Sequence, residues 1–213
     1  MTVKIKANER AFFVGTTGSG KTVLAKYLLN YSGDRIFVID PKHTFEHKNE
    51  DFEYAKNLPI FRKEFKIIYR PTKNDDRDMA NILTELYKRG NVLIYVDELA
   101  TTAKFFPATI EILEDISRTG RERYISLWCA TQRPRHVPVA MLTESEVWFV
   151  FLLRDPRDRR HMQGYVGEEV NEQIPMYHFW YARPGMASPE LMTLDLEENE
   201  LKEVEKTYQL ERR

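Results

Sequence analysis

The sequence predicts a single α/β domain whose mainly parallel central sheet is covered by helices on both faces. Short apolar segments, rich in β-branched and aromatic residues, alternate with segments of helical periodicity. A glycine-rich run lies where the first of these strands turns into the first helix. A length of 213 residues suits one such domain over residues 1–213, and we expect its core over about residues 9–183.

Five segments are predicted to be buried strands, because each is short, apolar and β-branched or aromatic. They are Ala11–Val14, Ile36–Ile39, Val92–Val96, Ile125–Ala130 and Val147–Leu153. Helices are predicted between them, one directly after the glycine-rich run and two with apolar residues on one face: Val23–Asn30, Met79–Arg89 and Ile110–Ser117. Strands that alternate with helices are typical of parallel pairing.

Four further segments complete the expected organisation. An extended segment is predicted over Lys66–Arg70, where Pro71 ends it, and a late strand over Tyr177–Tyr181. The polar stretch Pro41–Pro59 shows little periodicity and is predicted to be an irregular insertion. A charged helix is predicted near the end of the chain, over about residues 197–210.

Composition limits the classes of protein that this chain can represent. Hydrophobic residues make up 42% and charged residues 31%, which is typical of a globular protein. We expect no integral membrane segment and no signal peptide, because no apolar run reaches the roughly 20 residues that span a bilayer. A cytoplasmic location follows, which for a viral protein means the host cytoplasm, with association to the virion also open. The net charge of −1 gives no global reason to propose nucleic acid as a partner.

A phosphate-binding loop is predicted from the run GTTGSGKT, which satisfies the spacing Gly-x-x-x-x-Gly-Lys-Thr. Backbone N–H groups of the loop and the start of the following helix would face the same anion. Lys21 would reach the β- and γ-phosphates of ATP, and the Thr22 hydroxyl would bind Mg²⁺. The alternative is a glycine turn beside a surface lysine. The predicted nucleotide-binding residues are Gly15, Thr16, Thr17, Gly18, Ser19, Gly20, Lys21 and Thr22.

Two acids and an amide are candidates for the hydrolysis chemistry. Asp97 and Glu98 end the apolar segment VLIYVDE, and ligands bind at the carboxyl ends of parallel strands. Asp97 would hold the Mg²⁺ shell and Glu98 would polarise the attacking water, unless one of them only caps the next helix. Gln132 follows the fourth strand and would sense phosphate or position water, the alternative being a solvated turn.

Taken together, these motifs resemble those of the HerA/FtsK superfamily of hexameric DNA-pumping ATPases. The run VIDPKH at Val38–His43 is similar to the family's hydrophobic-Asp-Pro-Lys signature after the second strand. The run ISRTGRERYISLWCATQRP at Ile116–Pro134 is similar to its arginine-containing approach to the fourth strand. The likeness spans roughly Ala11 to Arg160. The small size, with no room for the extra domains of larger members, resembles most the packaging ATPases of icosahedral viruses with internal membranes.

The resemblance implies a RecA-like sheet of the additional-strand, catalytic-glutamate type, with Gln132 beside the nucleotide. It also implies a ring homo-oligomer, a hexamer or pentamer, in which an arginine from a neighbouring subunit completes the site. Arg118 and Arg121 match the arginines before the family's fourth strand, and Arg121 is the preferred finger. From the residues alone, solvated surface charges are an equal alternative.

The predicted function is therefore that of an ATPase that moves double-stranded DNA, most like a viral genome-packaging motor. A capsid vertex or a membrane component is a further expected partner. The alternative is an ATP-dependent assembly, secretion or conjugation-type adaptor of the same superfamily. The segment Lys104 with Phe105-Phe106, which follows the two acids, allows two interpretations. It would form either a pore-facing loop or part of the core.

Overall fold

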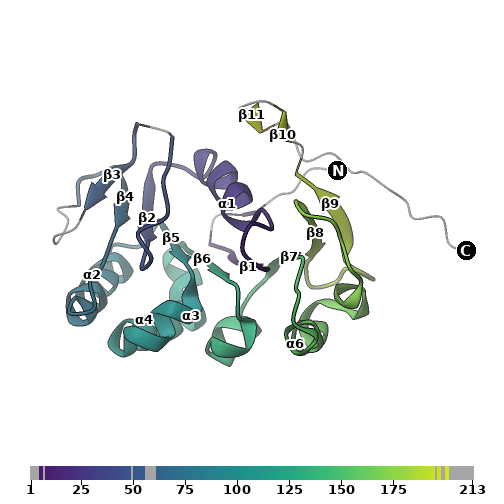
Figure 1. The fold of residues 1–213 in the computed structure, drawn as a ribbon. Coiled ribbons are helices and arrows are strands. Elements are labelled where there is room, and N and C mark those ends of the chain that lie inside the picture. Colours follow the sequence, from purple (N-terminus) through teal and green to yellow (C-terminus); the bar gives the residue numbers. More distant parts are fainter. Residues whose placement is uncertain are drawn as a thin grey trace, which may run out of the picture.

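The protein, described here from a computed structural model, is built on one nine-stranded sheet (Figure 1). The structure describes residues 5–6, 8–48, 50–55, 61–194, 196–197 and 200–201. Across the sheet the strands follow the order β3 (Glu53–Ala55), β4 (Phe65–Tyr69), β2 (Arg35–Ile39), β5 (Val92–Asp97), β6 (Ile125–Thr131), β1 (Arg10–Val14), β7 (Val147–Phe151), β8 (His178–Ala182) and β9 (Glu190–Thr193). The pairs from β3 to β7 are parallel, whereas β8 and β9 pair antiparallel.

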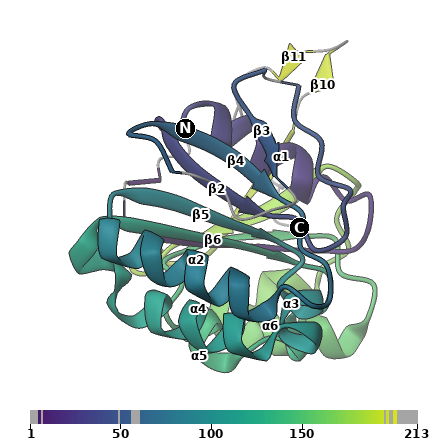
Figure 2. The same cartoon turned by 90° about the vertical axis from the view of Figure 1, so that its left-hand side faces the viewer.

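Helices cover the two faces of the sheet unequally. One face carries α1 (Lys21–Asn30), and the other carries a layer of helices, as Figures 1 and 2 show. The members of this layer are α2 (Asp76–Arg89), α3 (Leu99–Phe105), α4 (Pro107–Thr119), α5 (Val139–Thr143) and α6 (Pro156–Val166). Short 3₁₀ turns, η1 (Gly120–Arg123), η2 (Pro134–His136) and η3 (Glu168–Asn171), connect them to neighbouring elements.

The strand residues divide between two hydrophobic clusters because side chains alternate across a sheet. Phe13 packs in the cluster that contains Leu24 and Leu29 of α1. Its neighbour Phe12 packs in the opposite cluster, which contains Leu83 of α2 and residues of α4, α5 and α6. Strands buried on both faces in this way read as continuous apolar runs, which is the pattern that predicted them.

The predicted α/β class is confirmed, and so are all seven predicted strands, with small shifts at their ends. The largest shift is at β7, which was predicted to reach Leu153 but ends at Phe151. Beyond that end, the Leu152 carbonyl accepts a hydrogen bond at 2.9 Å from the backbone N–H of Thr16, which keeps the segment after β7 beside the loop after β1. The late strand becomes β8 and pairs antiparallel with β7.

Three other expectations need correction. The stretch Pro41–Pro59 is not wholly irregular, because β3 pairs parallel with β4 at the edge of the sheet. The sheet continues past residue 183, because β9 pairs with β8 and buries Met192. The charged helix expected over about residues 197–210 does not begin at its predicted start, where β10 (Leu196–Glu197) and β11 (Glu200–Leu201) pair antiparallel. The rest of that range lies outside the described residues.

The helices within the described ranges are all too short or too polar to cross a lipid bilayer.

Gly90 joins α2 to β5 in a backbone conformation, φ 62° and ψ −175°, that side chains rarely permit. A Cβ at this position would lie 2.6 Å from the backbone carbonyl oxygen of Arg123. We therefore expect Gly90→Ala to lower the free energy of unfolding by about 1–3 kcal/mol. Chemical denaturation of the two proteins measures the difference.

Gly164 is the matched control for this substitution. It lies inside α6, and a Cβ there would meet no atom within 4 Å. Gly164→Ala should raise the free energy of unfolding by roughly 0.5–1 kcal/mol, because alanine restricts the unfolded chain and favours the helix. Equal effects of the two substitutions would contradict the role assigned to Gly90.

Candidate active site

The glycine-rich loop connects β1 to α1 at the carboxyl edge of the sheet. Gly20 precedes α1 with φ 112°, and the helix begins at Lys21. Gly15 packs so tightly that a Cβ there would lie 2.6 Å from the Cβ of Phe151. The backbone N–H of Gly15 donates to the Thr131 carbonyl at 3.2 Å, which ties the loop to β6. The loop is thus held by the strands on both sides of β1.

Lys21 points back into this loop. Its side-chain amine donates to the carbonyl oxygens of Gly15 at 2.7 Å and Thr16 at 3.0 Å. Burial lowers the pKa of Lys21 to about 8, against the raising influence of the nearby charges of Glu98 and Asp97. The hydroxyl of buried Ser19 has no hydrogen-bond partner among the described residues. A buried amine and an unpaired hydroxyl in one loop suit an anion such as a phosphate.

Asp97 ends β5, two strands away from β1 in the sheet. The residue is 8% exposed, and its carboxylate accepts a hydrogen bond from the Tyr95 hydroxyl at 2.9 Å. Burial raises the pKa of Asp97 to about 6, and the charges of Asp40 and Glu98 act in the same direction. A divalent cation at this position would compensate the buried negative charge, so the carboxylate fits the role of a Mg²⁺ partner.

Glu98 follows Asp97 in a left-handed backbone conformation, φ 81° and ψ 72°, which is uncommon outside glycine. Three donors hold its buried carboxylate. Oε1 accepts from the Thr131 hydroxyl at 2.9 Å and from the Gln132 backbone N–H at 3.1 Å, and Oε2 pairs with the Lys42 amine at 3.1 Å. Such a conformation persists where the surroundings over-determine it, and it is concentrated at functional sites.

Gln132 lies between the two halves of the site. It follows β6, which is inserted between β5 and β1, as the resemblance implied. Its side-chain oxygen accepts a hydrogen bond from the Thr17 hydroxyl of the glycine-rich loop at 2.8 Å. Its backbone also contacts Glu98. The structure thus brings Lys21, Thr22, Asp97, Glu98 and Gln132 to one edge of the sheet.

Arg118 and Arg121 lie at the opposite edge. They precede β6, whose seven residues separate the two edges by about 20 Å. Arg118 pairs within its own helix with Glu114, at 3.1 Å, and Arg121 pairs with Glu146, also at 3.1 Å. Neither arginine can reach the glycine-rich loop of its own chain.

The aromatic residues Phe105 and Phe106, at the end of α3, lie in different environments. Phe106 is buried in the core at 2% exposure. Phe105 is 38% exposed, with the amines of Lys73 and Lys104 each 5.0 Å from its ring centroid. The core interpretation is therefore correct for Phe106 and wrong for Phe105.

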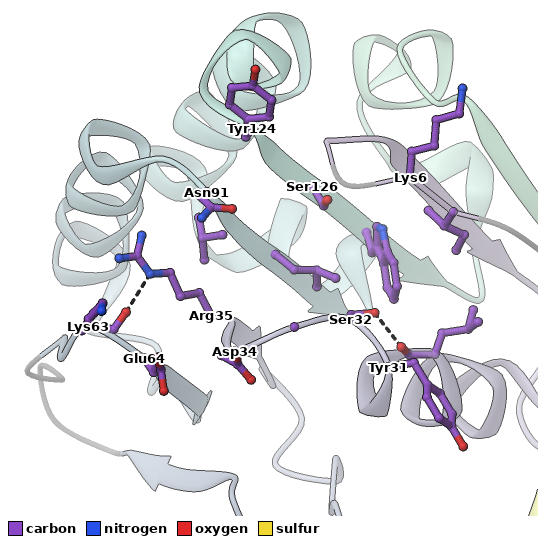
Figure 3. Close-up of a pocket in the computed structure, with 16 residues that line it drawn as sticks. Lys6, Tyr31, Ser32, Asp34, Arg35, Lys63, Glu64, Asn91, Tyr124 and Ser126 are labelled. Atoms are coloured by element: carbon purple, nitrogen blue, oxygen red, sulfur yellow. Dashed lines mark hydrogen bonds between the residues drawn. The ribbon is translucent and has the colours of Figure 1, made fainter.

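An open hollow of about 880 Å³ lies at the amino ends of β2, β5 and β6 (Figure 3). Polar residues that include Arg35, Asn91 and Tyr124 line it, around a floor that includes Trp128. Lys21, Asp97, Glu98 and Gln132 are at the other end of these strands, and none of the predicted active-site residues lines the hollow.

Two residues that sequence reasoning did not assign to the site are Lys42 and Thr131, the partners of Glu98. Lys42 was visible only as part of the VIDPKH run, which the resemblance singled out. Nothing in the sequence indicated that its side chain meets the carboxylate that follows β5.

The glycine-rich loop, the acids Asp97 and Glu98 at the end of β5 and the inserted strand β6 form the arrangement expected of a P-loop ATPase of the additional-strand class. The chain is similar to the DNA packaging ATPase P9 of Enterobacteria phage PRD1, with 28% identity over 181 residues, 81% of this chain and 77% of that protein. The predicted resemblance to viral genome-packaging ATPases is thereby confirmed. No family model matches the sequence.

Solved structures give the same picture of the fold. The genome packaging NTPase B204 of Sulfolobus turreted icosahedral virus 2, in complex with sulfate, superposes with a TM-score of 0.71 at 17% identity, over 91% of this chain and 100% of that chain. The cytoplasmic domain of the type VII secretion ATPase EccC of Thermomonospora curvata superposes with a TM-score of 0.67 at 12% identity, over 92% of this chain and 25% of that chain. Both the sequence pattern and the superposition on solved structures therefore support the α/β class.

Proposed function

We propose that this protein is the ATPase of a viral genome-packaging motor, which acts as a ring on double-stranded DNA. The observation that carries the proposal is the likeness to the DNA packaging ATPase P9, which extends over most of both chains. Support comes from B204, a packaging NTPase whose whole chain is matched by this fold. The site chemistry described above is that of nucleotide hydrolysis.

The proposed nucleotide is ATP, held by residues 15–22. Lys21 would exchange its present contacts with the loop carbonyls for the β- and γ-phosphates. The related fold of B204 is known in complex with AMPPCP and with ATP-gammaS, at TM-scores of 0.68 and 0.69. These two ligands are analogues of ATP, which supports the choice of a nucleoside triphosphate.

Mg²⁺ is the proposed metal, with Thr22 and Asp97 as its protein partners. Such an ion commonly takes one or two protein oxygens and completes its shell with phosphates and water, so a larger cluster of acids is not required. It would supply positive charge to the phosphates. Asp97, which is buried beside Asp40 and Glu98, would gain a counter-charge in addition to that of Lys21.

Glu98 is the proposed base that orients the attacking water. The water oxygen bonds to the γ-phosphorus, the bond to the bridging oxygen breaks, and ADP and phosphate are released. Gln132 lies between Glu98 and the glycine-rich loop, where its amide can sense the γ-phosphate or hold the water. Arg121, with Arg118 as second choice, would enter this site from the neighbouring subunit, because neither reaches its own.

An ATP-dependent secretion or assembly adaptor is the second candidate, and the likeness of fold to EccC is the observation that favours it. The two functions differ in how DNA affects hydrolysis. We expect duplex DNA to raise the ATP turnover of the assembled protein severalfold at low salt, with the effect falling as salt increases. Steady-state ATPase assays with and without DNA, beside size measurements with a non-hydrolysable analogue, check this.

Lys21→Ala is the control for contaminating activity, since it removes the buried amine of the loop. Turnover by an assembled ring that stayed indifferent to duplex DNA would reject the packaging function and leave the adaptor. Turnover without any assembly would reject the ring.

A further inference from the structure

Lys42 is held in a defined position beside the active site. It follows β2, which neighbours β5, so both strands deliver their next residues to the same edge of the sheet. The loop is anchored by Asp40, which is fully buried. The carboxylate of Asp40 accepts from the backbone N–H groups of Thr44 and Phe45, at 3.1 and 3.0 Å, and pairs with Arg70 at 3.0 Å.

Glu98 has little capacity left to orient water in the arrangement that the structure shows, because three of its roughly four acceptor positions are taken. Its Oε1 already receives two hydrogen bonds, from Thr131 and Gln132, and its Oε2 faces the amine of Lys42. Of these three donors, only Lys42 is both charged and partly solvent-exposed, with 38% of its side chain accessible. Lys42 is thus the donor that can move away from the Glu98 carboxylate without disturbing a strand.

Lys42 also lies near the place of the phosphates. Its partner Glu98 accepts a hydrogen bond from the backbone N–H of Gln132, whose side chain accepts from Thr17 of the glycine-rich loop, so a short chain of contacts joins Lys42 to the loop. A triphosphate carries more negative charge than one carboxylate and offers several acceptor oxygens.

We propose that Lys42 senses the γ-phosphate and controls Glu98. Lys42 holds Oε2 of Glu98 in the nucleotide-free site and exchanges it for the γ-phosphate when ATP binds, which frees Oε2 for the attacking water. The inference rests on the proposed function of Glu98 as the base. It means that the carboxylate becomes available only when a triphosphate, and not a diphosphate, is present.

The test compares binding of a non-hydrolysable ATP analogue with binding of ADP, and needs neither DNA nor turnover. Lys42→Met should weaken binding of the analogue roughly tenfold, the loss of one charged contact, and leave ADP binding within about twofold. Lys73→Met removes an equal charge at an exposed position over Phe105 and should change neither. Equal weakening of ADP and analogue would overturn the proposal.

A second arm uses Glu98→Gln, which removes the charge that competes for Lys42. This variant should bind the analogue severalfold more tightly than wild type, and the gain should shrink when Glu98→Gln is added to Lys42→Met, where only the lost repulsion between Glu98 and the phosphates remains. A gain of equal size with and without Lys42 would overturn the exchange. Thermal unfolding of each variant verifies that it is folded. The readout is nucleotide binding and involves no DNA. The inference about Lys42 could therefore hold even if DNA had no effect on turnover, so its failure and the failure of the packaging function are distinguishable.

Discussion

Glu98→Gln is expected to lower the ATP turnover number by about 10²–10⁴-fold while ATP remains bound. The amide has the shape of the carboxylate, and its oxygen can still accept from Thr131 and Gln132, so the local fold should persist. What is lost is the negative charge that would orient and deprotonate water. Single-turnover hydrolysis and equilibrium binding of labelled ATP measure the two effects separately.

Glu85→Gln is the matched control, since Glu85 lies on the exposed side of α2 and pairs at 2.8 Å with Arg89, which has no assigned role in the site. It should leave turnover close to that of wild type. Retention of more than about a tenth of wild-type turnover by Glu98→Gln would show that Glu98 is not the base.

Arg121→Ala is expected to lower turnover by about 10³–10⁵-fold in the assembled ring, as for other arginine fingers supplied in trans. The side chain is 62% exposed and paired with Glu146, about 20 Å along β6 from its own loop, so the defect should belong to the neighbouring site. Nucleotide binding by the isolated subunit should be unchanged. Steady-state ATPase measurements on assembled protein check the first expectation, and titration of the monomer checks the second.

Mixing two inactive variants tests whether the arginine acts between subunits. A Lys21→Ala subunit has an intact Arg121 that can complete the site of an Arg121→Ala neighbour. An equal mixture should therefore recover about a quarter of wild-type turnover, because one interface in four pairs an intact loop with an intact finger. Recovery that occurs with Arg118→Ala in place of Arg121→Ala would transfer the role to Arg118, and no recovery with either would exclude a finger in trans.

The strands that could be predicted are those whose signal is a continuous apolar run. Where the sequence analysis failed, the element was short, polar or ended for a reason outside its own residues. β3 is three residues long and exposes Tyr54, and α3 spans seven residues, too few to show a helical period. β7 stops at Phe151 although the apolar run continues to Leu153, so its end is not visible in the local pattern.

The sequence by itself singled out the predicted phosphate-binding loop at residues 15–22 and the candidate acids Asp97 and Glu98, because each of these motifs is contiguous and its chemistry is local. Only the tertiary structure decided what surrounds Glu98. Its partners Lys42 and Thr131 lie 56 and 33 residues away in the chain, and Gln132 meets Thr17 across 115 residues. Those meetings depend on the order of the parallel strands, in which β2, β5, β6 and β1 are neighbours and deliver their carboxyl ends to one edge. Strand order is set by packing between distant segments, so no local pattern encodes it.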